Sequence, residues 1–188
     1  MTVIATTTTE QLARQLNEIW DEARALIAPL SDAEFLERPA PGQWSVSECL
    51  THLNVTGHDY LAEIDKATAR GHEQDICGSG PFRYGLIGGT FIRLTEPPVR
   101  MRVGAPGRWT PAPDLDPDEI RREFDDLQAA LHERLAKADG LDLNRITLHS
   151  PLTRWLRLDL YEAFSLVLAH ERRHLWQARR VLDAIAAK

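Results

Sequence analysis

Four long segments of this chain repeat apolar residues at the spacing of an amphipathic helix, and this pattern limits the possible folds most strongly. The segments run from about Thr8 to Pro29, from Ser45 to about Arg70, from about Pro117 to Ala138, and from about Leu160 almost to Lys188. Apolar residues three and four positions apart form a stripe on one helix face, which must be buried against another element. Four such stripes predict an all-α fold.

Each segment also begins with a sequence typical of a helix N-terminus. A Ser, Thr or Asp that precedes an acidic residue by three positions can accept a hydrogen bond from the first turn. A similar signal predicts a short helical turn between the first two helices. The five signals are Thr7-x-x-Glu10, Ser31-x-x-Glu34, Ser45-x-x-Glu48, Asp116-Pro117-x-Glu119 and Asp159-x-x-Glu162.

The chain between about Gly71 and Pro113 is rich in Gly and Pro. A connection of this length lets consecutive helices of a bundle pack without being antiparallel neighbours. Strand-like stretches are short and isolated, at Met101-Arg-Val and Ile146-Thr-Leu-His. We therefore predict a four-helix bundle with a long Gly/Pro-rich crossover between helices 2 and 3, forming one domain over residues 1–188.

Composition excludes several classes of partner. The formal net charge of -6 argues against nucleic-acid binding. No stretch approaches the roughly 18 to 20 apolar residues of a membrane span, and the N-terminus has no basic and apolar signal sequence. Cys49 and Cys77 match neither a metal motif nor a disulfide framework. We expect a cytoplasmic protein with no nucleic-acid or membrane partner.

Two histidines lie on the apolar stripe of the last helix, where solvated side chains are not expected. His170 and His174 are four residues apart, one turn along the same face. Burying two imidazoles is unfavourable unless their nitrogens are satisfied, and a divalent metal would satisfy them. The stripe consists of Phe164, Val167, His170, His174, Ala178, Val181 and Ile185.

Two known metal motifs fit this segment poorly. His170-Glu171-Arg172-Arg173-His174 matches the zincin protease signature, but only Asp183 follows as a further ligand and Arg180 occupies a metzincin histidine position. A di-iron carboxylate bundle needs a second Glu-x-x-His motif besides Glu171-x-x-His174, and the chain has none. A mononuclear site is favoured.

The third ligand must come from upstream, and His52 is the best candidate. It lies three residues after Cys49 and next to Leu53, so it borders the core face of the second helix. Three protein nitrogens would leave open coordination positions, as in catalytic metal sites. The other histidines are expected to be solvated or to point elsewhere: His58, His72, His132 and His149.

Structural interpretations of the same residues remain open. His170 and His174 could be core histidines satisfied by carboxylates or water, and Glu48 is more typical of a capping box than of a ligand or base. Glu171 could reach toward a water on the metal or pair with a neighbouring arginine. Cys49 is more typical of a small buried apolar group than of a nucleophile.

The crossover is locally basic within an acidic chain. Its arginines could hold a carboxylate or phosphate of a ligand if the segment covers the metal, or they could pair with acids on the helices. The arginines are Arg83, Arg93, Arg100, Arg102 and Arg108, accompanied by Phe82, Tyr84, Phe91 and Trp109.

Two motifs together resemble the DinB/YfiT-like superfamily. They are Gly42-Gln43-Trp44-Ser45-Val46-x-Glu48-x-x-x-His52-Leu53 and His170-x-x-x-His174-x-x-Gln177, and the resemblance spans nearly the whole chain. It implies a four-helix bundle, frequent dimers, and a metal site formed by His52, His170 and His174. Better-understood relatives are metal-dependent transferases or isomerases that use low-molecular-weight thiols.

The resemblance and the ligand chemistry together predict a function. We expect one Zn²⁺ or Ni²⁺ ion that lowers the pKa of a bound water or thiol. The reaction would be thiol transfer to a small electrophilic molecule, thiol-assisted isomerisation, or hydrolysis. The alternative is a homodimeric metal-binding bundle of the stress-response type without catalysis. No residue is assigned a catalytic role at this stage.

Overall fold

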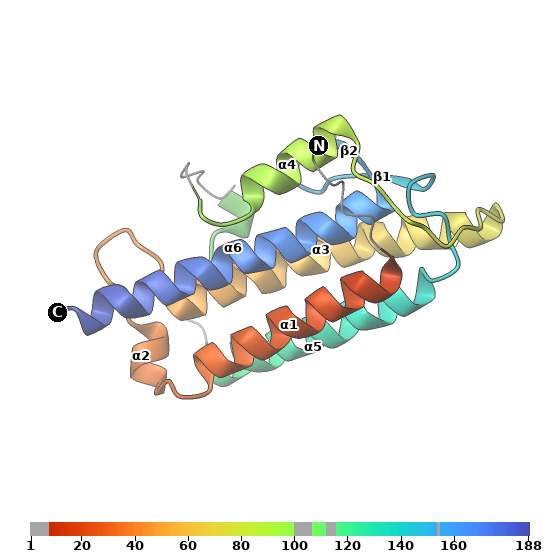
Figure 1. Ribbon diagram of the computed structural model, residues 1–188. Coiled ribbons are helices and arrows are strands. Elements are labelled where there is room, and N and C mark those ends of the chain that lie inside the picture. Colours follow the sequence, from red (N-terminus) through yellow and green to blue (C-terminus); the bar gives the residue numbers. More distant parts are fainter. Residues whose placement is uncertain (1–7, 100–106, 112–115, 154) are drawn as a thin grey trace.

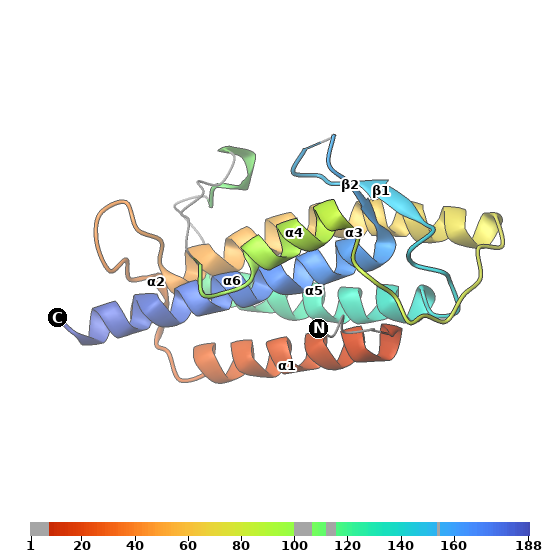
Figure 2. The same cartoon turned by 45° about the horizontal axis from the view of Figure 1, so that its top comes forward.

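Four long helices form the bundle in this computed structural model, which describes residues 8–99, 107–111, 116–153 and 155–188. They are α1 (Thr9–Ile27), α3 (Val46–Glu73), α5 (Pro117–Lys137) and α6 (Leu160–Ala186). Each begins and ends within three residues of its predicted bounds. The short predicted turn is α2 (Asp32–Leu36). The predicted all-α bundle is confirmed, as Figures 1 and 2 show.

The helix starts are fixed by the local capping that the sequence indicated. Capping boxes form at α2, α3 and α6, where the cap side chain and the third helical residue bond each other's backbone. α1 uses Thr8 and Gln11 in place of the predicted Thr7 and Glu10. α5 begins with Asp116, which accepts from the Asp118 N–H, and with Pro117 in its first turn.

The consecutive long helices α1 and α3 lie across the bundle from each other. Both pack against α5 and α6, which separate them. α3 and α5 run in the same direction, whereas α1 and α6 run the opposite way (Figure 1). The chain must therefore return along the length of the bundle between α3 and α5, and residues 74–116 make this return.

The crossover contains a helix that the sequence analysis missed, α4 (Leu86–Thr95), which packs along α6. Gly88 and Gly89 concealed it, because glycine lowers helix propensity by about 1 kcal/mol relative to alanine. Gly88 is required by packing, since the Glu162 carboxylate occupies the position that a Cβ would take.

Both ends of α4 are attached to α6. At its start, the Gly85 N–H donates to Glu162 Oε1 at 2.8 Å. At its end, the guanidinium of Arg172 pairs with the Glu96 carboxylate. The crossover is therefore fixed to the helix that carries His170 and His174.

A two-stranded antiparallel hairpin leads into α6. β1 (Thr147–His149) pairs with β2 (Arg157–Asp159), with Leu148 opposite Leu158. The strand-like stretch after Ile146 is therefore confirmed, and its partner strand was not predicted. The other predicted stretch, Met101-Arg-Val, lies outside the described residues. A 3-10 turn, η1 (Gly107–Trp109), is the last element before α5.

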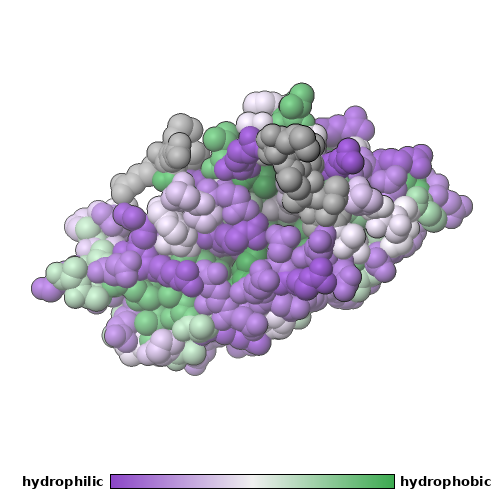
Figure 3. Space-filling view, in the orientation of Figure 1, coloured by the Kyte–Doolittle hydropathy of each residue, from purple (hydrophilic) through white to green (hydrophobic). Residues whose placement is uncertain are grey.

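The surface view is mostly hydrophilic, with hydrophobic residues coming to the surface over α4 and around α2 (Figure 3). On α4, Leu86, Ile87 and Leu94 are more than half exposed, and the large exposed hydrophobic side chains of the described residues include none on α1. Among the described residues no helix has the length and apolar character needed to cross a membrane.

Candidate metal centre

The bundle brings His52 of α3 together with His170 and His174 of α6. The Nε2 atom of His170 lies 3.3 Å from Nε2 of His52 and 3.1 Å from Nε2 of His174. One nitrogen from each ring falls within 4.8 Å of the other two. The structure thus joins the three predicted site residues across 118 positions of sequence.

All three imidazoles lie inside the bundle, as the apolar stripe indicated. His52 and His174 are buried, and His170 is half-buried. Burial lowers the pKa of each ring, because the charged form loses its hydration. For His170, burial, the neighbouring His52 and the charge of Arg173 lower the pKa to about 3. At neutral pH the rings are uncharged, which is the form that binds metals.

A backbone carbonyl from the crossover orients His52. The carbonyl oxygen of Trp109 lies 2.8 Å from His52 Nδ1, so Nδ1 must carry the proton and donate it. The Nε2 lone pair of His52 then points toward His170 and His174. This is the usual arrangement of a histidine ligand, whose second nitrogen donates to a carbonyl or carboxylate.

His174 lacks an equivalent partner. Its Nδ1 atom is buried, and no described residue makes a well-formed hydrogen bond with it. Gln177 lies one turn further along α6. Its side chain raises the pKa of His174, but by less than burial and the neighbouring groups lower it. The His174 ring instead packs against the ring of Trp44. The two ring planes are inclined by 27°, and their centroids lie 5.9 Å apart.

Two tryptophans form aromatic walls around the histidines. Trp44 lies just before α3, and its ring centroid is 5.1 Å from that of His52. The ring of Trp109 lies nearly perpendicular to the same imidazole, at a centroid distance of 6.4 Å. Trp109 is buried, with 6% of its surface exposed. These walls lower the local polarity and therefore strengthen electrostatic interactions within the site.

Two of the three separations between the ring nitrogens fit a tetrahedral metal ion, and the third is at most 4.8 Å. Two nitrogens bound to Zn²⁺ at about 2.0–2.1 Å lie roughly 3.3 Å apart in tetrahedral geometry. The two measured separations, 3.3 and 3.1 Å, are close to this value. The cluster includes no acid or cysteine among the described residues. An ion held here would have three neutral ligands and at least one position for an exogenous group.

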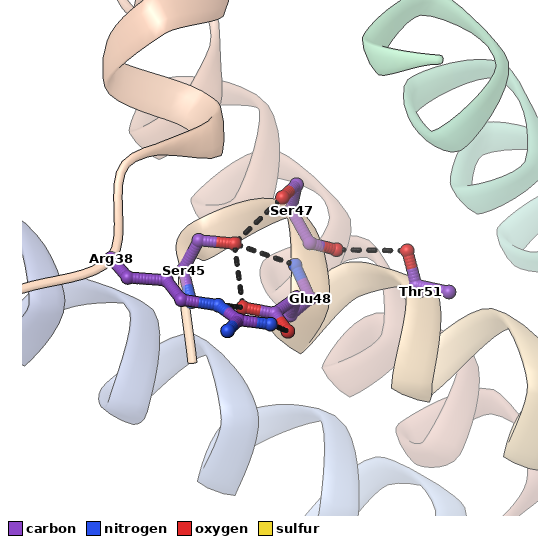
Figure 4. Close-up of polar contacts among 5 residues, drawn as sticks. All are labelled: Arg38, Ser45, Ser47, Glu48 and Thr51. Atoms are coloured by element: carbon purple, nitrogen blue, oxygen red, sulfur yellow. Dashed lines mark hydrogen bonds and ion pairs between the residues drawn. The ribbon is translucent and has the colours of Figure 1, made fainter. Parts of the chain in front are cut away.

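Glu48 serves the start of α3, as the capping-box interpretation held. Its Oε2 accepts from the Ser45 N–H at 2.9 Å, and Arg38 binds both carboxylate oxygens (Figure 4). Burial would raise the pKa of Glu48, but the bonds from Arg38 and Ser45 outweigh it and leave the pKa lowered. The network fixes the first turn of α3, one turn before His52.

Thr51 and Ser47 extend the same ordered turn. The Thr51 hydroxyl donates to the Ser47 carbonyl at 2.9 Å, and the hydroxyls of Ser45 and Ser47 lie 2.7 Å apart (Figure 4). The hydrogen bonds are local along α3, so this part of the site follows directly from the Ser45–Glu48 motif.

Glu171 makes a hydrogen bond that neither interpretation of it included, and its reach toward a water on the metal stays a prediction. Its Oε1 accepts from Gln128 Nε2 of α5 at 2.7 Å in the core, whereas the neighbouring Arg172 pairs with Glu96. Burial raises the pKa of Glu171 to about 7. It is not among the residues of the histidine cluster. Sequence spacing could not show this, because the bond depends on which helix packs against that side of α6.

The remaining histidines stay apart from the cluster. His58, His72 and His149 are exposed, as expected. His132 departs from the prediction, because it is half-buried and packs beside Trp20 at a ring distance of 6.1 Å. Its Nε2 is buried with no hydrogen-bond partner among the described residues.

The cysteines are unsuited to act as nucleophiles at this centre. Cys49 is completely buried, and burial raises the pKa of its thiol far above its ordinary value. This confirms the interpretation of Cys49 as a small core residue. Cys77 is a free thiol beyond the end of α3. Because α3 rises about 1.5 Å per residue, the distance from His52 to the end of α3 is roughly 30 Å.

The crossover arginines do not converge on the histidines where they are described. Arg83 and Arg93 are exposed. Arg100, Arg102 and the side chain of Arg108 lie outside the described residues. The crossover residue that reaches the site is Trp109, whose sequence signal was only its place among the crossover aromatics. Arg173 of α6 was also missed, and its charge lowers the pKa of all three histidines.

Comparison with known proteins agrees with this geometry. The family model of the DinB superfamily matches residues 15–178, a range that includes His52, His170 and His174. The chain belongs to the DinB superfamily. The predicted resemblance is therefore confirmed, and the metal-ligand roles of the histidines in this DinB superfamily protein stay predictions.

Two proteins from Bacillus subtilis are similar to this one in sequence or in fold. The protein is similar to the uncharacterized protein YuaE of strain 168, with 25% identity over 175 residues, covering 89% of this chain and 93% of YuaE. Its fold is similar to that of YfiT, a four-helix bundle with an unusual topology, at a TM-score of 0.62 and 12% identity. The match to YfiT covers 99% of this chain and 92% of that one.

Proposed function

We propose that this DinB superfamily protein is a mononuclear metal-dependent enzyme that activates a nucleophile against a small electrophilic substrate. The observation that carries the proposal is the convergence of three neutral imidazoles inside the bundle, with Nε2 of His170 3.3 Å from that of His52 and 3.1 Å from that of His174. We propose Zn²⁺ or Ni²⁺ as the ion, held by His52, His170 and His174. When bound, such an ion acts as a Lewis acid that lowers the pKa of a water or thiol ligand.

The ligand set favours catalysis over a purely structural ion. Structural zinc sites are closed by four protein ligands, whereas catalytic sites keep an open position. Within the described part of the chain, the cluster offers three ligands and no carboxylate or thiolate to close it. YfiT, which shares the fold, is described as a "probable metal-dependent hydrolase". This description supports a metal-dependent reaction for the present protein.

Neither cysteine of the chain is placed to act as the nucleophile. Cys49 is buried with a strongly raised pKa, and Cys77 lies far along α3. The candidates are therefore water, which would make the protein a hydrolase, and a low-molecular-weight thiol, which would make it a transferase or isomerase. The positive charge of Arg173 beside the histidines would favour an anionic group on the substrate or thiol.

The protein residues prepare the site for this chemistry. Trp44 and Trp109 exclude water from two sides of the imidazoles. The capping network of Ser45 and Glu48 fixes the turn that precedes His52. These groups orient the ligands before a substrate arrives, so little reorganisation is needed during reaction.

A paired assay tests the proposal. The protein loaded with Zn²⁺ or Ni²⁺ is offered activated esters in one series, and common cellular thiols with a chlorinated aromatic electrophile in another. Metal-dependent turnover that is lost in His174→Ala and kept in His132→Ala would support an enzyme, and the active series would identify the nucleophile. Tight metal binding without turnover in either series would favour the non-catalytic bundle instead.

The homodimer also stays a proposal. It was expected from the family resemblance. The exposed apolar residues on α4, which include Leu86, Ile87 and Leu94, make α4 the candidate contact surface. Sedimentation equilibrium of the metal-loaded protein would show whether two copies associate.

A further inference from the structure

Trp109 is hydrogen-bonded at two points to the same helix. Its backbone carbonyl accepts from His52 Nδ1 at 2.8 Å. Its indole Nε1 donates to Asp59 Oδ2, also at 2.8 Å. Both partners belong to α3, whereas Trp109 belongs to η1 of the crossover. The residue therefore joins the crossover to the helix that supplies one of the three histidines.

The spacing of the two partners suits this bridge. Asp59 follows His52 by seven residues, so the two side chains lie on nearly the same face of α3, about two turns apart. That separation is about 10 Å along the axis, at a rise of about 1.5 Å per residue. A tryptophan can span it, with its backbone at one turn and its indole nitrogen at the other.

The tautomer of His52 decides whether its Nε2 can accept a metal. A neutral imidazole carries its single proton on one nitrogen, and only the other nitrogen has a lone pair. If the proton were on Nε2, it would point at His170 Nε2, 3.3 Å away, and would occupy the space between the ligands. The Trp109 carbonyl opposes that state, because it can only accept a hydrogen bond.

We propose that Trp109 and Asp59 are positioning residues that hold His52 in its Nδ1–H tautomer and so keep its Nε2 lone pair directed at the metal position. The inference rests on the proposed metal-dependent function. Asp59 acts through the indole, because it fixes the turn whose carbonyl bonds His52. His52 is the ligand that needs this control most, since it comes alone from α3 whereas His170 and His174 share α6.

The tautomer can be measured directly in the metal-free protein. Long-range ¹H–¹⁵N correlation of the imidazole distinguishes a protonated Nδ1 from a protonated Nε2. We expect His52 to be Nδ1–H in the native protein, and a mixture of tautomers in Trp109→Phe, which keeps the ring and carbonyl but loses the indole N–H. Trp155→Phe is the matched control, because Trp155 is 86% exposed. An unchanged Nδ1–H form in Trp109→Phe would overturn the proposal.

A double-mutant cycle on metal affinity tests whether the two residues act as a unit. Competition titration with Zn²⁺ should give a Kd raised about tenfold in Trp109→Phe and in Asp59→Ala, the lower end of the losses seen for outer-sphere partners. The double variant should lose no more affinity for Zn²⁺ than either single variant does. Asp59→Asn should restore near-native affinity, because its amide oxygen can still accept from the indole. Additive losses of affinity, or no loss, would contradict the proposal that Trp109 and Asp59 act as a unit.

The two measurements separate this inference from the proposed function. If the native protein bound no Zn²⁺ or Ni²⁺, the function would be wrong, while the tautomer measurement would still decide the role of Trp109. If the native protein bound metal with the tautomer unaffected by Trp109→Phe, the function would stand and the positioning role would fail.

Discussion

Replacing His174 with alanine should leave the metal-free protein almost as stable as before, yet remove its stabilisation by metal. In the described part of the chain, the buried Nδ1 of His174 has no well-formed hydrogen-bond partner. An unsatisfied buried group costs about 1–3 kcal/mol, and His174→Ala removes this cost. The variant also loses the packing of the ring against Trp44, which costs a similar amount. We therefore expect the free energy of unfolding without metal to change by about 1 kcal/mol or less.

With metal, the difference should be large. A ligand that binds only the folded state at a concentration 100 times its Kd stabilises by about 2.7 kcal/mol. An unfolding entropy of about 2.1 cal/mol/K per residue over the 188 residues gives about 0.4 kcal/mol/K. The native protein should thus gain about 7 °C in Tm from saturating metal, and His174→Ala should gain almost none.

Differential scanning calorimetry with and without Zn²⁺, together with elemental analysis of the same samples, measures both effects. His132→Ala is the control, because His132 is half-buried but belongs to another part of the bundle. It should keep the full metal-induced shift whatever its own stability. A native-sized shift in His174→Ala, or equal losses in both variants, would refute the ligand assignment.

Three further predictions concern pH and packing. Burial lowers the pKa of His52, His170 and His174, so protons should compete with the metal only in more acid solution than for ordinary imidazoles. Elemental analysis after dialysis should find the metal retained at pH 6, close to the ordinary imidazole pKa of about 6.5, and released only in more acid solution; release already at pH 6 would contradict this expectation. Burial raises the pKa of Asp159 from 3.8 to about 7, so the folded protein disfavours ionisation of this carboxyl group. The stability that Asp159 contributes is therefore greatest in acid and is lost as the pH rises toward 7. Asp159→Asn keeps a helix-capping side chain but removes the charge. Urea unfolding should therefore find this variant more stable than the native protein at pH 8 by about 1–2 kcal/mol, and the gain should be smaller at pH 5. A gain in stability that grew in acid would contradict this reasoning. Gly88→Ala should destabilise the folded protein by about 1–3 kcal/mol, because the new Cβ would meet the buried Glu162 carboxylate. Gly107→Ala is the control, since among the described residues no atom lies within 4 Å of its new Cβ. This variant should show no such loss in the same urea experiment.

The helix bounds and two of the site residues could be predicted because they depend on neighbours in sequence. A cap such as Ser45 bonds a group three residues away, and the face shared by His170 and His174 follows from the helical repeat. The choice of His52 also used helix periodicity, since it borders the apolar face of α3. Such short-range interactions are present in the sequence whatever the rest of the chain does.

The tertiary structure alone decided which partners meet across long separations. α4 escaped prediction because Gly88 suits a close approach to Glu162, a contact that local helix propensity cannot reveal. The hydrogen bond from Gln128 to Glu171 was not predicted, because Gln128 lies on another helix. The carbonyl of Trp109 has no side-chain signature at all, yet it sets the tautomer of His52. Local periodicity determined the helices and the histidine pair, whereas the topology of the bundle determined what surrounds them, because packing between distant segments follows from how all the buried faces fit together.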